Sequence, residues 1–324
     1  MRFTRRHMLA AGAALLAARS GSAQSAWPNR SVRLISSSPP AGASDILTRT
    51  LGQALQDQTG QSFVVENKPG AAGVIGSDFV AKSAPDGYTW LTANVGPQAI
   101  NQTLLPHQPF DSRKDFRYVT IIGRLPIVML VNKDVPAKDL KEFVALAKSR
   151  KGGLTYASSG SGLLGHLGME LLKLQANFEA VHIPYKGASP ALVDTIAGQV
   201  DAFFPTIISG LPQVKSGKVR VIAVTTLKRA ALLPDVPTVA EQGYPGYEVN
   251  GWYGMLAPAG TPKDVVAYLN REVGEVLRSA EGRERLAAEG AEGAGNTPEQ
   301  FAAYMQSEAV KWGKVVKQAG ARAD

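Results

Sequence analysis

The sequence predicts an α/β fold with two doubly wound, Rossmann-like domains joined by a two-segment hinge. A chain of 324 residues, 44% of them hydrophobic, is long enough to form two separate cores. The order strand–helix–strand–helix–strand occurs twice, once in residues 32–94 and once in residues 154–206. Two apolar segments, 119–133 and 247–260, lie where the chain would pass between the two halves.

At the N-terminus, residues 1–23 are predicted to form a secretory signal peptide rather than part of the fold. The stretch MRFTRR is cationic, HMLAAGAALLAA is apolar but too short to span a bilayer, and Gly21-Ser22-Ala23 offers small residues for cleavage. Arg5-Arg6 also resembles a twin-arginine signal, so the general secretory and twin-arginine routes both stay open. We therefore expect an exported, periplasmic protein.

Charge and composition exclude several classes of function. Without the leader's four arginines the chain carries 31 basic and 27 acidic residues, a net charge of +4 with no basic run, which does not favour nucleic-acid binding. The sequence contains no cysteine, which excludes disulfides, thiol nucleophiles and cysteine metal sites. Its histidines lack metal-ligand spacing, so we expect neither a metal nor a cofactor.

In the first half, the pattern predicts strands over 32–38, 62–67 and 88–94, with helices over 45–58 and 74–83. A turn, PPAGAS, follows the first strand, and a loop, KPGAAG, follows the second. The leucines that share one face of the first helix are Leu47, Leu51 and Leu55. These leucines are expected to be ordinary core.

The second half repeats this order. Strands are predicted over 154–159, 180–185 and 200–206, with a helix directly after the Gly160–Gly162 turn and another over 191–199. The apolar stripe of the helix after the turn consists of Leu164, Leu167, Leu171 and Leu174. Two consecutive units of this kind predict two parallel sheets with helices on both faces.

The remaining segments connect the two halves. Residues 119–133 are predicted to form two strands that meet at Pro126, and the apolar segment 247–260 returns the chain to the first sheet. Helices over 263–279 and 298–318 are expected to pack on the first domain. The predicted domains are therefore residues 27–124 together with 250–324, and residues 125–249.

Each half has a Ser- and Gly-rich turn between its first strand and the helix that follows. Ligands of doubly wound sheets bind beyond the carboxyl ends of the strands, and a helix N-terminus there presents unpaired N–H groups and partial positive charge. Small residues matter because a Cβ would hold the backbone away from a bound carboxylate. Two such turns that face each other predict an anion clamp made of neutral donors.

Two enzyme classes are compatible with parts of the second turn. Gly160, Gly162 and Gly165 fit the dinucleotide spacing G-x-G-x-x-G, but Glu179 precedes the next strand instead of ending it, where the ribose partner belongs. Ser161 lies between glycines, yet Ser159 and Leu163 stand where a nucleophile elbow requires glycine. The sequence therefore favours neither a dinucleotide-binding enzyme nor a serine hydrolase.

A series of motifs runs along nearly the whole mature chain. They are WPNRSVRLI (27–35), PPAGASD (39–45), VVENKPGAAGVIG (64–76), APDGYTW (84–90), PFDSRKDF (109–116), YASSGSGLLGHL (156–167), VHIPYKGASPALVD (181–194), LPDVPTVAEQGYPGYE (233–248) and APAGTP (257–262). In this order and spacing they resemble the motifs of Bug-type periplasmic solute receptors of tripartite tricarboxylate transporters. Compared with the usual family pattern, Ala41 and Ala72 replace glycines, and Gln102 follows Asn101 where proline is usual.

The resemblance implies a type II periplasmic binding protein architecture, with a carboxylate held in a cleft by main-chain N–H groups and water. It also implies delivery of the ligand to a membrane permease of one large and one small subunit. Carried over by position, it assigns ligand contacts to the first loop (Ser38 to Asp45), to the second loop (Ser159 to Gly162) and to Asn94.

Several single residues have competing roles. Ser44 and Asp45 are expected first of all to cap the following helix, with Asp45 facing its own backbone. His166 is expected to pack in the first turn of its helix or, alternatively, to form a cleft wall. Asp201 is expected to be a hydrogen-bonded strand-end residue, the alternative being a partner for a ligand ammonium. One of Phe203 and Phe204 is core, and the other could line the cleft.

Together these arguments predict one ligand site. Its residues are Ser38, Pro40, Ala41, Gly42, Ala43, Ser44, Asp45, Asn94, Ser159, Gly160, Ser161, Gly162, His166, Asp201 and Phe204. We expect a monomeric, non-enzymatic receptor that closes on a small organic carboxylate: a di- or tricarboxylate, an aromatic acid or an acidic amino acid. The alternatives are a ligand-binding partner of a signalling system and, more remotely, an NAD-dependent oxidoreductase.

Overall fold

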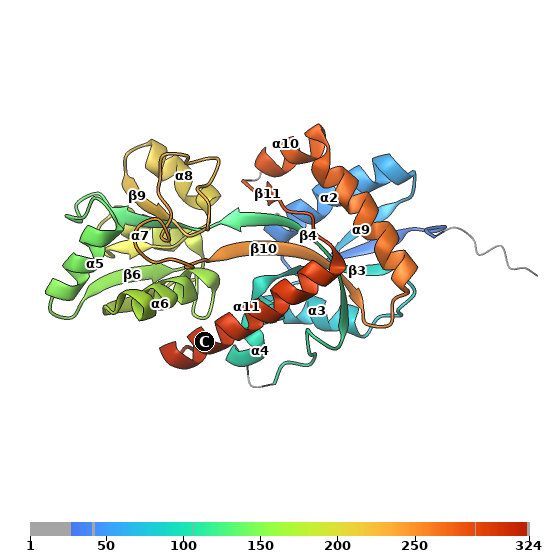
Figure 1. The fold of residues 1–324 in the computed structure, drawn as a ribbon, viewed down its shortest axis with the longest axis horizontal. Helices are drawn as coiled ribbons and strands as arrows, with labels where there is room; N and C mark the ends of the chain where they lie inside the picture. The colour runs from blue at the N-terminus through green and yellow to red at the C-terminus, as the bar shows by residue number, and fades with distance from the viewer. Residues whose placement is uncertain (1–26, 41–42, 106, 289, 323–324) are drawn as a thin grey trace, which may run out of the picture.

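The computed structural model describes residues 27–40, 43–105, 107–288 and 290–322, which form two lobes, each built on one sheet (Figure 1). The first lobe has a six-stranded sheet of order β11-β4-β10-β3-β1-β2, and the second has a five-stranded sheet of order β7-β6-β8-β5-β9. The predicted fold class, α/β with two sheets, is confirmed.

Strands of the first lobe are mostly where the sequence places them. They are β1 (Val32–Ser36), β2 (Phe63–Asn67), β3 (Thr89–Asn94), β4 (Phe116–Pro126), β10 (Asn250–Pro258) and β11 (Glu292–Gly293). Strand β1 pairs in parallel with β2 and β3, with Leu34 opposite Val65 and Trp90, whereas β10 runs antiparallel to β3 and β4. The two-residue β11 has no counterpart in the sequence-based expectation.

Helices cover both faces of this sheet, as a doubly wound fold requires. They are α2 (Ala43–Thr59), α3 (Val74–Ala81), α4 (Asn101–Leu104), α9 (Lys263–Arg278), α10 (Ala280–Ala288) and α11 (Pro298–Ala319), with short turns η1 (Ala71–Gly73) and η2 (Gly96–Ile100). Adjacent strand residues point to opposite faces. Leu34 packs with the leucines of α2 and with α9, whereas Ile35 packs with Val74 of α3. The predicted core leucines Leu47, Leu51 and Leu55 are buried.

The second lobe combines parallel and antiparallel pairing. Its strands are β5 (Val128–Asn132), β6 (Leu154–Ser158), β7 (Ala180–Pro184), β8 (Ala202–Phe203) and β9 (Val219–Val224). Its helices are α5 (Leu140–Ser149), α6 (Leu164–Ala176), α7 (Ala188–Ile196) and α8 (Ile207–Lys215). The β6 strand is parallel to β7 and β8, and β5 is antiparallel to β8 and β9.

One predicted helix stripe is partly wrong. Leu167 of α6 is fully buried, but Leu174 is 43% exposed, and Leu172 takes its place in the core. The C-terminal helix α11 also differs from expectation, because it packs against α6 of the second lobe as well as against the first lobe. It begins with a capping box in which the Thr297 side chain accepts from the Gln300 N–H.

Two neighbouring chain segments connect the lobes, and Figure 1 shows β4 and β10 running side by side between them. Strand β4 of the first sheet ends at Pro126, and β5 of the second sheet begins after Ile127, so the two predicted strands do meet here. Asn250 at the start of β10 lies opposite Pro126, and Thr225 donates its N–H to the Ile127 carbonyl. No helix in the described part of the chain is long and apolar enough to cross a membrane.

The turn before β6 provides a matched test of backbone packing. Gly152 and Gly153 both have positive φ (87° and 75°), but only at Gly153 would a Cβ meet backbone, the Glu179 carbonyl oxygen at 2.4 Å. Gly152→Ala should therefore cost about 1–2 kcal/mol from left-handed strain alone. Gly153→Ala should cost about 1–3 kcal/mol more because of the clash. Urea unfolding measures both losses in stability, from the shift of the midpoint at an unchanged m-value. Equal midpoints for the two variants would contradict this packing.

Candidate ligand site between the lobes

A cavity of about 610 Å³ lies between the two lobes, within the size range of small-molecule sites. From the first lobe it is lined by Ser37, Ser38, Pro39, Gly70, Ala72, Gly73, Asn94, Val95, Gly96, Ile100 and Asn101. From the second it is lined by Ser159, Gly162, Leu163, Leu164, Gly165, Phe204, Pro205 and Thr206. The connecting segments contribute Leu125, Ile127, Gly251, Trp252 and Tyr253.

The site is at the carboxyl ends of the parallel strands, where doubly wound sheets bind ligands. Ser37, Asn94, Ser159 and Phe204 each end or directly follow one of the strands β1, β3, β6 and β8. Five predicted site residues come together here: Ser38, Asn94, Ser159, Gly162 and Phe204. Of the phenylalanine pair, Phe203 is core, packed with Ala157 and Ala191, and Phe204 lines the cavity.

Other predicted residues lie elsewhere. Pro40 is exposed and is not among the lining residues, and neither are Gly160 and Ser161. Ala41 and Gly42 lie outside the described residues, and Ala43 is the first residue of α2.

The prediction that Ser44 and Asp45 cap α2 is wrong, because the helix begins at Ala43 and both residues lie in its first turn. The side chain that receives a helix N–H is Ser38, whose Oγ accepts from the Asp45 N–H at 3.2 Å. Ser44 instead donates from its Oγ to the Thr92 carbonyl. The hydroxyl of Ser38 therefore ties the loop after β1 to the start of α2.

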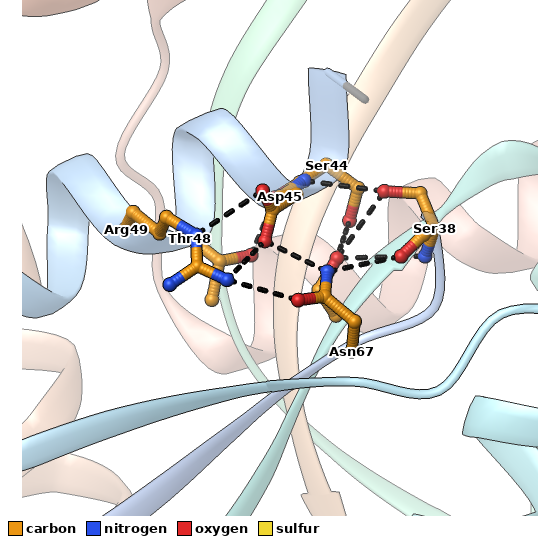
Figure 2. Close-up of polar contacts among 7 residues, drawn as sticks. Ser38, Ser44, Asp45, Thr48, Arg49 and Asn67 are labelled. Carbon is orange, nitrogen blue, oxygen red and sulfur yellow. Dashed lines mark hydrogen bonds and ion pairs between the residues drawn. The ribbon is translucent and has the colours of Figure 1, made fainter. Parts of the chain in front are cut away.

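The Asp45 carboxylate forms an ion pair with Arg49 and accepts a hydrogen bond from Asn67, as Figure 2 shows. Its oxygens accept from Arg49 Nη2 at 3.0 Å, from Arg49 Nε at 3.1 Å and from Asn67 Nδ2 at 2.7 Å. Asn67 Nδ2 also donates to the Ser38 carbonyl. Because this acid is paired beneath the first loop, it does not oppose a bound anion.

The second turn is held from within its own lobe. The Gly162 N–H donates to His166 Nδ1 at 2.9 Å, and the His166 ring stacks on His182 with centroids 3.8 Å apart. His182 Nε2 in turn lies 2.7 Å from Ser158 Oγ. His166 is therefore a buried first-turn residue that positions the turn, and the cavity lining does not include it.

Gly162 is also the point where the second turn approaches the first lobe. Its φ is 73°, and a Cβ there would lie 2.3 Å from Leu104 Cδ2 of α4. Glycine is thus favoured by the backbone conformation, and a Cβ here would also displace the Leu104 side chain.

Asp201 does not join the site. Its carboxylate accepts from the Thr155 N–H at 2.7 Å, from Thr155 Oγ1 at 2.9 Å and from Arg150 at 3.0 Å. Thr155 is near the start of β6 and Asp201 directly precedes β8, so both lie at the opposite edge of the sheet from Ser159 and Phe204. Asp201 is therefore a hydrogen-bonded structural residue at a strand end and is not placed to pair with a ligand ammonium.

Most of the other lining residues were not selected from the sequence, and Ser37 and Asn101 are two polar examples. Both residues are 4% exposed, and Ser37 Oγ and Asn101 Nδ2 are buried without a hydrogen-bond partner among the described residues. A buried donor without a partner costs about 1–3 kcal/mol. The serine run after β1 was a signal for Ser37, whereas Asn101 reaches the cavity only through the tertiary placement of α4.

The loop between β2 and α3 approaches the cavity in a strained conformation. Ala71 and Ala72 have positive φ values of 46° and 52°, and Gly70 and Gly73 beside them have 123° and 90°. Left-handed backbone costs a non-glycine residue about 1–2 kcal/mol. Because Gly70, Ala72 and Gly73 line the cavity, the strain is stored at the candidate site, as is common for binding loops.

Every described lining residue is uncharged. Asn94 Oδ1 accepts from the Gly96 N–H at 3.0 Å, so the atom of Asn94 that can donate to a ligand is Nδ2. On the cavity floor, burial raises the pKa of Tyr253 to about 12, and its phenol therefore stays protonated near neutral pH. Neutral hydrogen-bond donors and apolar groups make up the whole described surface of this site.

These features define a two-lobed α/β binding protein with a neutral ligand cavity at the junction of its lobes. Residues 47–321 match the family model described as tripartite tricarboxylate transporter family receptor. The chain is 36% identical to BugT of Bordetella pertussis over 297 residues, which cover 91% of each protein. The chain belongs to this receptor family, and it is therefore a solute receptor rather than an enzyme.

Solved structures agree with this assignment. The R. palustris protein Rpa4515, solved with adipate, is 36% identical with a TM-score of 0.79 over 92% of this chain and 100% of its own. MatC (Rpa3494) from Rhodopseudomonas palustris, solved with bound malate, is 32% identical with a TM-score of 0.74 over 90% of this chain and 100% of its own.

The buried Asp45 should depend on Arg49. Arg49→Met removes the main counter-charge of a carboxylate whose side chain is 4% exposed, and we expect a loss of about 1–3 kcal/mol in unfolding free energy. The matched control is Arg30→Met, because Arg30 pairs with Asp86 at the surface with 62% and 43% exposure and should contribute less than about 1 kcal/mol. Thermal unfolding of both variants measures the two losses in unfolding free energy. Equal losses would show that the Asp45–Arg49 pair stabilises the fold no more than the surface pair does.

Proposed function

We propose that this receptor binds a small organic carboxylate in the cavity between its lobes. The observation that carries the proposal is a cavity at the carboxyl ends of the parallel strands of both lobes, whose described lining is uncharged and includes the polar residues Ser38, Asn94 and Ser159. Hydrogen bonds to a charged group contribute about 1.5–3 kcal/mol each, so a few neutral donors are enough to hold an anion. Adipate and malate in Rpa4515 and MatC support this ligand class.

Within the site we assign roles by position. Asn94 donates from the first lobe, Ser38 holds the loop after β1, and main-chain N–H groups of the loops assist. Ser37 and Asn101 of the first lobe and Ser159 and Phe204 of the second lobe line the same cavity. The paired Asp45 stays structural.

We further propose that ligand binding closes the lobes. Residues 27–124 with 250–324 form one domain and residues 125–249 the other, and the hinge is the pair of segments at Pro126–Ile127 and Val249–Asn250. Few-residue connections of this kind suit hinge closure around a ligand. Trp252, buried on the cavity floor beside the hinge, would report closure by fluorescence.

In the cell, we propose that the mature chain is a periplasmic monomer that delivers its ligand to a permease of one large and one small subunit. Support for the transport role comes from the receptor family. Support for export comes from the basic and apolar N-terminal segment, residues 1–23.

A thermal-shift screen tests the ligand class. The mature chain is heated with mono-, di- and tricarboxylates and with the matching amides. A ligand at 100 times its Kd should stabilise the folded state by about 2.7 kcal/mol, and an amide should lose that effect because it lacks the charge. If the strongest stabiliser were uncharged, the carboxylate proposal would fail.

Asn101→Asp tests the site itself. The substitution keeps the shape of the side chain but places a negative charge on a residue that lines the cavity, so affinity for the best carboxylate should fall at least tenfold, or about 1.4 kcal/mol. Gln56→Glu is the control, because Gln56 is exposed on α2 and undergoes the same change in charge. Isothermal titration compares the carboxylate affinities of the two variants. Equal affinities would show that Asn101 is not part of the ligand site.

A further inference from the structure

A second groove lies on the first lobe, away from the cavity between the lobes. It has a volume of about 730 Å³ and is bordered by α9, by α11 and by the start of β4. None of the described residues that line it also lines the cavity between the lobes. The groove is therefore a separate feature of the surface, which the carboxylate site does not explain.

Most of the charged side chains of this groove are cations. Arg113, Arg117 and Lys263 line it, and Glu299 is the one acid among its described lining residues. Within the described chain, neither Arg117 nor Lys263 forms an ion pair. Arg113 pairs with Asp111 at 3.2 Å. Two cations of the groove thus have no counter-charge of their own.

Glu299 is already engaged at the start of α11. Hydrogen bonds from its own backbone N–H and from the Thr297 side chain lower the pKa of its carboxyl, which binds there as a carboxylate. Helices α9 and α11 both begin at the groove, and their N-termini add partial positive charge. Asp264 in the first turn of α9 is exposed but does not line the groove. The groove therefore favours a negatively charged partner.

One border of the groove is an uncovered strand edge. Phe116, Arg117 and Tyr118 at the start of β4 line it. Strand β10 pairs along one side of β4, whereas β11 pairs with the other side only at Gly123 and Arg124. Among the described strands, none covers the second side at the start of β4. Open strand edges of this kind bind extended peptide segments through main-chain hydrogen bonds.

The neighbouring walls leave room for an extended segment. Ala267 of α9 and Ala302 of α11, both small, line the groove. A second cavity of about 470 Å³ adjoins it and continues along α11 as far as Val310, whose side chain is 70% exposed. From Pro298 to Val310 a helix rises about 18 Å, which equals roughly five or six residues of extended chain.

We propose that this groove is a docking site for an extended, acidic segment of a partner protein. Carboxylates of the segment pair with Arg117 and Lys263, and its main chain lies along the open edge of β4. Charge complementarity and the strand edge together select this occupant, because a small free anion would use the cations but not the edge. Since the groove and the cavity between the lobes share no described residue, the receptor can hold its ligand and this partner at once.

Peptide binding tests the proposal. A fluorescein-labelled hexaglutamate peptide and its hexaglutamine counterpart are titrated with the mature chain in low-salt buffer, and binding is followed by fluorescence anisotropy. Hexaglutamate should bind saturably and at least about tenfold more tightly than hexaglutamine. Hexaglutamate with methylated peptide nitrogens keeps its charges but cannot donate main-chain hydrogen bonds, so it should also bind at least about tenfold more weakly. Equal binding of the methylated peptide would overturn docking at the strand edge.

Matched variants locate the bound peptide. Lys263→Gln and Arg117→Gln each remove one cation of the groove and should weaken hexaglutamate binding at least about threefold. Lys228→Gln is the control, because Lys228 is an exposed lysine of the second lobe without an ion pair in the described chain. Arg117 is partly buried, so the exposed Lys263 decides if Arg117→Gln does not fold. Equal affinities of Lys263→Gln and Lys228→Gln, or no saturable hexaglutamate binding, would overturn the docking site.

Discussion

The paired crossing of β4 and β10 is the constraint on which the rest of the structure depends. These strands belong to the first sheet, and their neighbours Ile127 and Val249 enter the second lobe, so both sheets are anchored to one antiparallel ribbon. The ribbon brings the carboxyl ends of the parallel strands of both lobes to the same space. Its own residues, among them Trp252, form the floor of the cavity that results.

Anion recognition without cations follows from this arrangement. Strand ends deliver short polar side chains, Ser37 and Asn94, and the nearby acid Asp45 is already paired with Arg49 and Asn67. A neutral site pays less desolvation cost than one with buried charges and still gains strong bonds once an anion arrives.

Much of this could be predicted from the sequence, because hydrophobic periodicity and strand-to-helix turns are local signals. They placed Ser38 and Gly162 at the cavity, whereas Asn94 came from the family resemblance. Local signals failed for residues whose position relative to the cavity depends on the sheet topology or on neighbouring elements. Asp201 precedes its strand and so lies at the wrong edge, and Asn101 reaches the cavity only because α4 packs there. Likewise, the role of His166 in holding Gly162 is a contact that spacing alone does not reveal.

The most direct test is a crystal structure of the mature chain with its tightest-binding carboxylate. The proposed function predicts a carboxylate group in the cavity between the lobes, with its oxygens about 2.7–3.2 Å from neutral donors such as Asn94 Nδ2, the Ser159 hydroxyl and main-chain N–H groups of the loops. A ligand bound outside this cavity, or one without a negatively charged group, would contradict it.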